Sequence, residues 1–185
     1  MNVKHDLRSI ILLAAALTAA CGDPFEPILT PIPEAQQTEL IDFDDGALVD
    51  PAAYDMFSGN AVRTDQSNAW DFLFIVDDAL GPSFLPRAGL LGEESTAGLQ
   101  HADEAFDLIE DAPDSGYTMD ALVPIEAGDV LLMVSRRNPQ LSIRCRVYGK
   151  LEVLSIEGSP AAVTVNVVIN PNCERRELID EEDED

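Results

Sequence analysis

Apolar and polar residues alternate along residues 144–155 and again along residues 162–170. A repeat of two residues places the apolar side chains of a stretch on one face, which is typical of a β-strand with one buried side. The residues between the two stretches include Gly158, Ser159 and Pro160, which favour a turn. The pattern therefore predicts an antiparallel hairpin. Its apolar positions are Val147, Leu151, Val153, Val163, Val165, Val167 and Ile169.

The register of this hairpin follows from the requirement that its apolar residues share one face. A turn centred near Ser159 pairs Val153 with Val165 and places Cys145 opposite Cys173. Directly opposed residues in a non-hydrogen-bonded pair have Cα atoms about 4.5 Å apart, a distance that a disulfide can bridge. We therefore predict a Cys145–Cys173 disulfide, and two buried free thiols are the alternative.

Further strands are predicted upstream of the hairpin. Residues 129–135 form an apolar, β-branched run that turns back through residues 136–140, so residues 129–170 read as a three-stranded antiparallel meander. Residues 68–76 are apolar on nearly both faces, which is typical of a buried central strand. Residues 61–64 are a candidate hairpin partner for that strand.

Two segments lack a clear alternation. Residues 77–92 are rich in Gly and Pro and read as a long loop. Residues 93–112 carry apolar side chains at helical spacing before Pro113, so they predict a short helix or an irregular loop. The fold class expected from the whole pattern is all-β, an antiparallel meander-rich sheet or sandwich with at most one short helix.

The N-terminus has the pattern of an export signal. Lys4 and Arg8 precede an apolar run at residues 10–17, which is shorter than the roughly 20 residues that a membrane span needs. Small residues then lead to Cys21. We therefore expect residues 1–20 to be a signal peptide.

The residues around the expected cleavage point resemble a bacterial lipobox, with Thr18 where the usual motif has Leu. This resemblance implies that Cys21 is lipidated and becomes the first residue of the mature chain; ordinary secretion with a free thiol is the alternative. Acyl chains on Cys21 would anchor the protein stably to a membrane. Gly22, in place of the Asp that signals inner-membrane retention in enteric bacteria, favours the outer membrane over the inner one.

The remaining chain divides by composition. Residues 21–46 are expected to form a lipidated, Pro-rich tether. Residues 47–176 are expected to form the β-domain. Residues 177–185 end in a run of acids and read as a disordered tail.

Composition narrows the function classes. The chain carries 35 acidic and 11 basic side chains, a formal net charge of −24, which argues against nucleic acid as a partner. Hydrophobic residues make up 46% of the chain, enough to bury a core.

Catalytic and metal-binding motifs are missing from the sequence. It contains no nucleophile elbow, metalloprotease motif or phosphate-binding loop. Carboxylates are too numerous for any pair to be singled out as the acid and base of a glycosidase. Residues 42–46 resemble the start of a calcium loop but lack its later ligands. We expect no enzyme activity and no metal site.

Basic residues gather near the C-terminus, where the predicted hairpin places several on its outward face. They form a candidate site for an anionic ligand at Arg136, Arg144, Arg146 and Lys150. Internal neutralisation by nearby acids such as Glu174 is the alternative.

Two stretches resemble the HmuY-like family of bacterial lipoproteins. The first is the strand that contains Trp70 and Asp71, and the second is the C-terminal meander with Tyr148, Gly149 and Lys150. The resemblance covers residues 55–170 and implies an all-β fold and a surface or periplasmic haem-binding protein of iron acquisition.

The best-known members of that family hold the haem iron between two histidines. His101 is the only histidine of this chain after the signal peptide, so the resemblance makes His101 and Met119 the first candidates for haem ligands. Met56, Met133 and several tyrosines, Tyr54 among them, are further residues with suitable donor atoms.

The sequence therefore predicts a non-catalytic, lipid-anchored lipoprotein of the bacterial cell envelope that acts as a binding or interaction module. Its partner is an envelope protein or a small ligand. A haem-binding protein of iron acquisition is the alternative.

Overall fold

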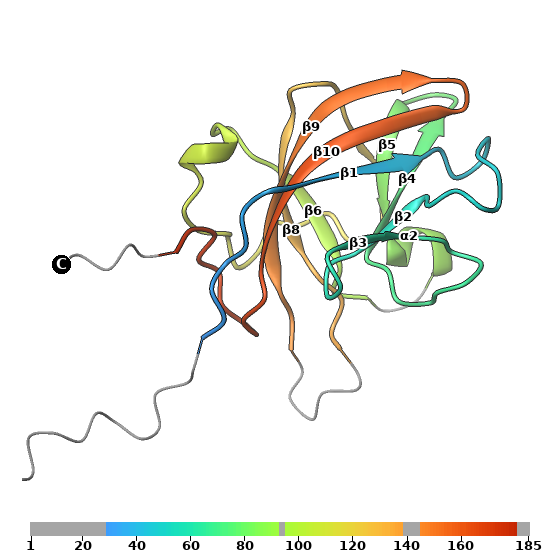
Figure 1. Cartoon of the computed structure of the whole chain (residues 1–185). Coiled ribbons are helices and arrows are strands. Elements are labelled where there is room, and N and C mark those ends of the chain that lie inside the picture. Colours follow the sequence, from blue (N-terminus) through green and yellow to red (C-terminus); the bar gives the residue numbers. More distant parts are fainter. Residues whose placement is uncertain (1–28, 93–94, 139–144, 181–185) are drawn as a thin grey trace, which may run out of the picture.

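The alternating stretches near the C-terminus form a long antiparallel hairpin of strands β9 (Tyr148–Gly158) and β10 (Ala161–Asn170) (Figure 1). Val153 pairs with Val165, so the predicted register is confirmed on the side of the hairpin away from the turn. A register shift follows at Thr164. The structure is a computed structural model that describes residues 29–92, 95–138 and 145–180.

The predicted disulfide is present at the open end of this hairpin. Cys145 and Cys173 are bonded, and their Cα atoms are 5.0 Å apart. The disulfide fixes the segments that precede β9 and follow β10.

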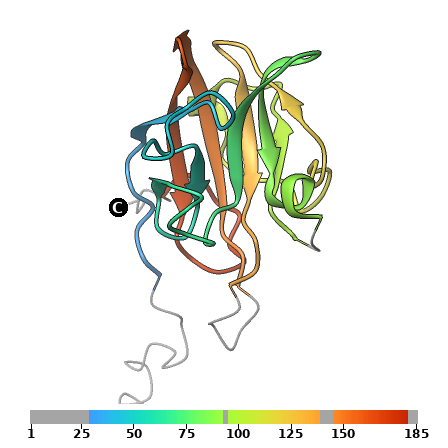
Figure 2. The ribbon, with the colours of Figure 1, turned by 90° about the vertical axis from the view of Figure 1, so that its right-hand side faces the viewer.

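Two five-stranded antiparallel sheets form a β-sandwich (Figures 1 and 2). The first sheet has the order β1-β10-β9-β8-β6, and its remaining strands are β1 (Gln36–Ile41), β8 (Val130–Val134) and β6 (Gly98–His101). The second sheet has the order β3-β2-β4-β5-β7, with strands β3 (Asn60–Val62), β2 (Ala53–Asp55), β4 (Phe72–Asp77), β5 (Gly81–Pro86) and β7 (Val123–Pro124).

The main core lies between the two sheets. Inward-facing valines and leucines of the first sheet, such as Val165 and Leu151, belong to the same buried cluster as Phe72, Phe74 and Phe84 of the second. The ring of Phe84 contacts those of Phe72 and Phe74 edge to face. Burial of these side chains is the dominant force that joins the layers.

A second buried cluster covers the outer face of the first sheet. Phe106, in a single 3-10 turn (Phe106–Leu108), packs there with Tyr148 and Leu178. The chain around this turn is held by hydrogen bonds from Ala112 N–H to Arg176 O and from Leu178 N–H to Glu110 O. Both faces of the hairpin are therefore buried in this region.

Several predicted elements differ from the observed ones. Residues 77–92, expected as a loop, contain β5 and a helix of five residues, α2 (Arg87–Leu91). Residues 93–112, expected as a short helix or loop, contain β6 and the 3-10 turn. Leu99 of this stretch belongs to the main core and Phe106 and Ile109 belong to the second cluster, so the residues at helical spacing are buried on two different faces of the first sheet.

Strand pairing also corrects one expectation. Residues 61–64 do not pair with the strand at residues 68–76, because β3 pairs with β2, and β4 lies between β2 and β5.

The boundaries of the β-domain lie further out than expected. β1 falls within residues 21–46, the range expected to be tether, and its Leu40 is fully buried in the core. At the other end Leu178 is buried and Glu177 forms a bridge with Asp111, so residues 177–180 pack on the domain. β1 could not be recognised from the sequence, because its alternation is short and it follows a Pro-rich stretch.

Some predictions fall outside the described residues. These concern the signal peptide at residues 1–20, the lipidation of Cys21 and the position of Arg144. Within the described ranges, no helix has both the length and the apolar character needed to cross a membrane.

Candidate binding site

The two edges of the sandwich differ. At one edge β6 and β7 lie together, and a ring nitrogen of His101, Nε2, is 3.0 Å from the carbonyl oxygen of Pro124. At the other edge the start of β1 and the β2–β3 turn leave a pocket of about 210 Å³, which we call the slot. Its lining residues are Pro33, Glu34, Gln36, Tyr54, Met56, Phe57, Ser58, Gly59, Val147, Val167, Ile169 and Pro171.

The walls of the slot are apolar because they are extensions of the sandwich core. Val147 and Val167 come from the inward face of the first sheet, and Met56 comes from the end of β2. All three side chains are buried. An apolar ligand group that entered the slot would pack against these side chains and remove its own surface from water.

Tyr54 contributes a buried polar group to the lining, and Glu34, Gln36 and Ser58 add exposed polar side chains. Tyr54 is 2% exposed and stacks on Phe72, with ring centroids 5.5 Å apart. Its hydroxyl has no hydrogen-bond partner among the described residues, whereas Tyr117 Oη donates to the carbonyl oxygen of Pro113 at 2.9 Å. Tyr54 Oη is not fully enclosed by protein atoms, so it can offer a hydrogen bond to a ligand in the slot.

Burial also keeps this phenol protonated. Loss of solvent around the ring, and then the nearby carboxylates of Asp55 and Asp71, raise the pKa of Tyr54. Tyr54 Oη can therefore donate as well as accept at neutral pH.

The β2–β3 turn forms one wall of the slot, and a buried ionic cluster holds it. Met56 N–H donates to Asp71 Oδ2 at 2.8 Å, and Phe57 N–H donates to Asp55 Oδ1 at 3.2 Å. Gly59 N–H donates to the backbone oxygen of Asp55, and Gly59 has φ of 66°, a conformation that favours glycine.

Arg136, which follows β8, joins the two carboxylates. Its Nη1 donates to Asp71 Oδ2 and its Nη2 donates to Asp55 Oδ1, both at 2.8 Å. Its backbone N–H donates to Asp71 Oδ1 at 2.7 Å. The guanidinium carbon lies 5.3 Å from the ring centroid of Phe57, a cation–π arrangement. The cluster Asp55–Asp71–Arg136 thus links the first sheet to the turn that walls the slot.

Burial makes Asp71 titrate close to neutral pH. Loss of solvent raises the pKa of Asp71 from its usual 3.8 to about 6, although the charge of Arg136 and the hydrogen bonds from Arg136 and Met56 favour the ionised form. Asp55 adds to the rise by repulsion.

Charge limits what the slot can hold. Among the described residues that line it, Glu34 alone carries a formal charge at neutral pH. The slot thus offers no cation to an anion, and the chain as a whole carries −24. An anionic ligand is therefore disfavoured, and a neutral group suits the apolar inner walls.

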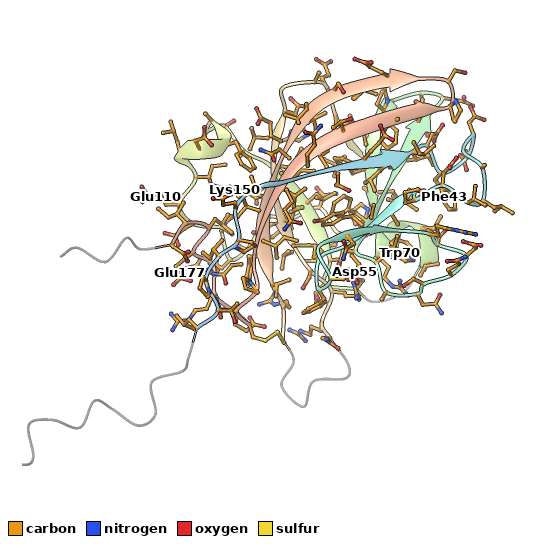
Figure 3. All side chains as sticks on the ribbon, in the orientation of Figure 1. Phe43, Asp55, Trp70, Glu110, Lys150 and Glu177 are labelled. Atoms are coloured by element: carbon orange, nitrogen blue, oxygen red, sulfur yellow. A yellow bond between two sulfur atoms is a disulfide. The ribbon has the colours of Figure 1, made fainter. Side chains whose placement is uncertain are left out.

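The structure does not gather the described members of the predicted anion patch. Arg136 is paired with Asp55 and Asp71, and Arg146 with Glu174 at 2.9 Å. Lys150 faces outward as predicted but is covered by the second cluster, where Nζ donates to Ile109 O at 2.8 Å. Figure 3 shows Lys150 on the side of Glu110 and Glu177, away from Asp55.

The two candidate haem ligands also lie apart. Leu99 points into the core, so His101, two residues on, faces the same side of β6. Met119 lies beside Gly98, on the opposite side of that strand. The structure therefore does not place His101 and Met119 on one ligand, and haem binding stays a prediction.

Metal binding receives no support from the arrangement of the carboxylates. Among the described residues, no group of three or more His, Cys, Asp or Glu side chains is placed to hold a metal ion. Asp42, in the predicted calcium-like turn, is buried and accepts a hydrogen bond from Val76 N–H at 3.0 Å.

The slot was not predicted from the sequence. Tyr54 and Met56 do alternate with Asp55, but β2 is only three residues long and gives too short a signal. The Trp70-Asp71 pair was singled out, and the structure gives Asp71 a partner 65 residues away in Arg136.

No family model, curated protein or solved structure matches the chain.

Proposed function

We propose that this protein is a non-catalytic, lipid-anchored binding module of the bacterial cell envelope, and that the slot is its binding site. The observation that carries the proposal is that Tyr54 Oη, which forms no hydrogen bond with the described residues, lies in a pocket whose inner walls are apolar. Binding pockets commonly combine apolar walls with a few polar groups that orient the ligand.

The size of the slot narrows the ligand. An apolar cavity of about 150 Å³ is known to hold benzene, and pockets for drug-sized ligands span roughly 300–1,000 Å³. The slot, at about 210 Å³, lies between these limits. A neutral group of one or two rings, or a branched aliphatic group, with a polar atom for Tyr54, is the ligand class that the slot supports.

Indole is a suitable probe, because it is neutral, compact and carries one N–H group. We expect the purified full-length chain to bind indole saturably in a calorimetric titration. Gln36→Trp should abolish binding, because Gln36 is exposed at the rim and a larger side chain there closes the slot. Gln37→Trp is the matched control, since Gln37 faces the other side of β1.

Tyr54→Phe tests the polar contact separately. Loss of one hydrogen bond should weaken indole binding about two- to tenfold. Absence of saturable binding, or equal binding by the Gln36→Trp and Gln37→Trp proteins, would contradict the slot as the site.

Haem can be tested on the same proteins. The resemblance to HmuY-like lipoproteins motivates this test, but the slot is smaller than a macrocycle of that size needs. A saturable, stoichiometric Soret shift that His101→Ala or Met119→Ala weakens would favour haem over a smaller ligand.

A further inference from the structure

The ionic cluster Asp55–Asp71–Arg136 is not needed to hold the two sheets together. The chain already has an extensive apolar core between the sheets, and buried ion pairs contribute little net stability compared with apolar contacts. The cluster instead places its hydrogen bonds on consecutive residues of the β2–β3 turn. Met56 and Phe57 each donate a backbone N–H to one of its carboxylates.

Phe57 connects the cluster to the ligand site. Its ring lies over the guanidinium of Arg136, and Phe57 also lines the slot. A second surface hollow, lined by Asp55, Phe57, Ser58 and Arg136 among others, lies beside the slot. Phe57 and Ser58 line both hollows, so the wall that they form has open space on each side. The ionic cluster is its main support.

We infer that Arg136, Asp55 and Asp71 act as positioning residues for the slot, and that binding there requires Asp71 to be ionised. This inference rests on the slot being the binding site. When Asp71 is protonated, it loses its charge attraction for Arg136 and accepts hydrogen bonds more weakly. The turn of residues 56–59 is then held less firmly, and the slot loses its defined wall.

The groups that face Asp71 are few. Arg136 approaches from the end of β8, and Asp55 and Tyr54 approach from β2. Arg87, whose N–H donates to the backbone oxygen of Asp71, directs its side chain over the ring of Trp70 instead. Burial, the charges of Arg136 and Asp55, and the hydrogen bonds from the Arg136 and Met56 N–H groups therefore govern the ionisation of Asp71.

The experiment is an indole titration of the full-length chain between pH 7.5 and pH 5. With the pKa of Asp71 at about 6, roughly one molecule in ten keeps Asp71 ionised at pH 5, so affinity should fall about tenfold. Asp71→Asn, which is never ionised, should bind at pH 7.5 more weakly than the unmodified chain does at pH 5, with no pH dependence. Arg136→Lys keeps the charge but cannot contact Asp55 and Asp71 through two separate nitrogens, so its affinity for indole should be intermediate.

Asp65→Asn is the matched control. Asp65 forms an exposed ion pair with Arg63, so the same substitution there should leave affinity and its pH dependence unchanged. Thermal unfolding monitors the fold in parallel. Because the pKa of Asp71 is raised in the folded state, protonation of Asp71 favours folding as the pH falls from 6 towards 4. A weakened affinity at pH 5 should therefore occur in a folded protein.

A measurement without ligand separates this inference from the proposed function. The amide NMR signals of Phe57 and Gly59 should shift with a midpoint near pH 6, and Asp71→Asn should remove that step. If indole fails to bind but these signals titrate as described, the slot is not an indole site while the positioning role is supported. The inference would be overturned if the Phe57 and Gly59 signals did not shift near pH 6 or shifted equally in Asp71→Asn. Binding that is independent of pH and unchanged by Asp71→Asn would also overturn it.

Discussion

Two tyrosines illustrate what a single hydroxyl contributes at the scale of the residue. Tyr117 donates to Pro113 O, whereas Tyr54 has no partner among the described residues. We expect Tyr117→Phe to lower the free energy of unfolding by about 1 kcal/mol and Tyr54→Phe to change it by less than about 0.5 kcal/mol. Urea unfolding of both variants tests the pair. An equal loss in both would mean that Tyr54 has a partner inside the protein.

The residues of the slot show why a site is harder to predict than a strand. Arg136 was expected to offer its charge to an anion, because the sequence shows where charges are but not which of them are paired. Its partners Asp55 and Asp71 are 81 and 65 residues away along the chain. Only the packing of one sheet on the other brings these groups together.

At the scale of the element, strands with a long alternation could be predicted and short ones could not. The pairing of β9 with β10 follows from local residues, because a shift of one position would turn Val163, Val165 and Val167 outward. β5 was hidden by Pro82 and Pro86. The structure tolerates them because β7 pairs only with Ser83 and Phe84, so neither proline lies where β5 is paired on both sides.

The hairpin disulfide yields a prediction of stability. Cys145 and Cys173 are 28 residues apart, and closure of a loop of that length stabilises a fold by about 3.5 kcal/mol in the chain-entropy treatment. We expect the double variant Cys145→Ala, Cys173→Ala to lose about that free energy of unfolding. Reduction of the unmodified chain should give a similar loss. A loss below about 1 kcal/mol in both would mean that the disulfide hardly restricts the unfolded chain.

At the scale of the whole molecule, the two described ends of the chain lie on one side of the sandwich (Figure 1). Ile32 N–H donates to Asp180 Oδ1 at 2.9 Å, and Thr30 N–H donates to Asn172 Oδ1 at 2.8 Å. The slot begins one residue further on, at Pro33. A membrane anchor at Cys21 would therefore hold the slot within about 40 Å of the lipid, the extended reach of the intervening chain.

The anchor itself is open to a direct test. Expressed in a bacterium fed labelled palmitate, the full-length chain should incorporate the label and sediment with membranes. Cys21→Ser should abolish both, because the acylated thiol is lost. An unlabelled, soluble exported chain would instead support ordinary secretion.

The disulfide adds a condition to the proposed binding at the slot. Val147 and Pro171 line the slot, and each lies two residues from a bonded cysteine. In a reducing cytoplasm this bond does not persist, whereas it forms in an oxidising envelope. A newly made chain still inside the cell would thus carry an unfinished wall, and export would complete it. If the slot is the binding site and the chain is exported, as proposed, the slot would be complete and able to bind its ligand only after export.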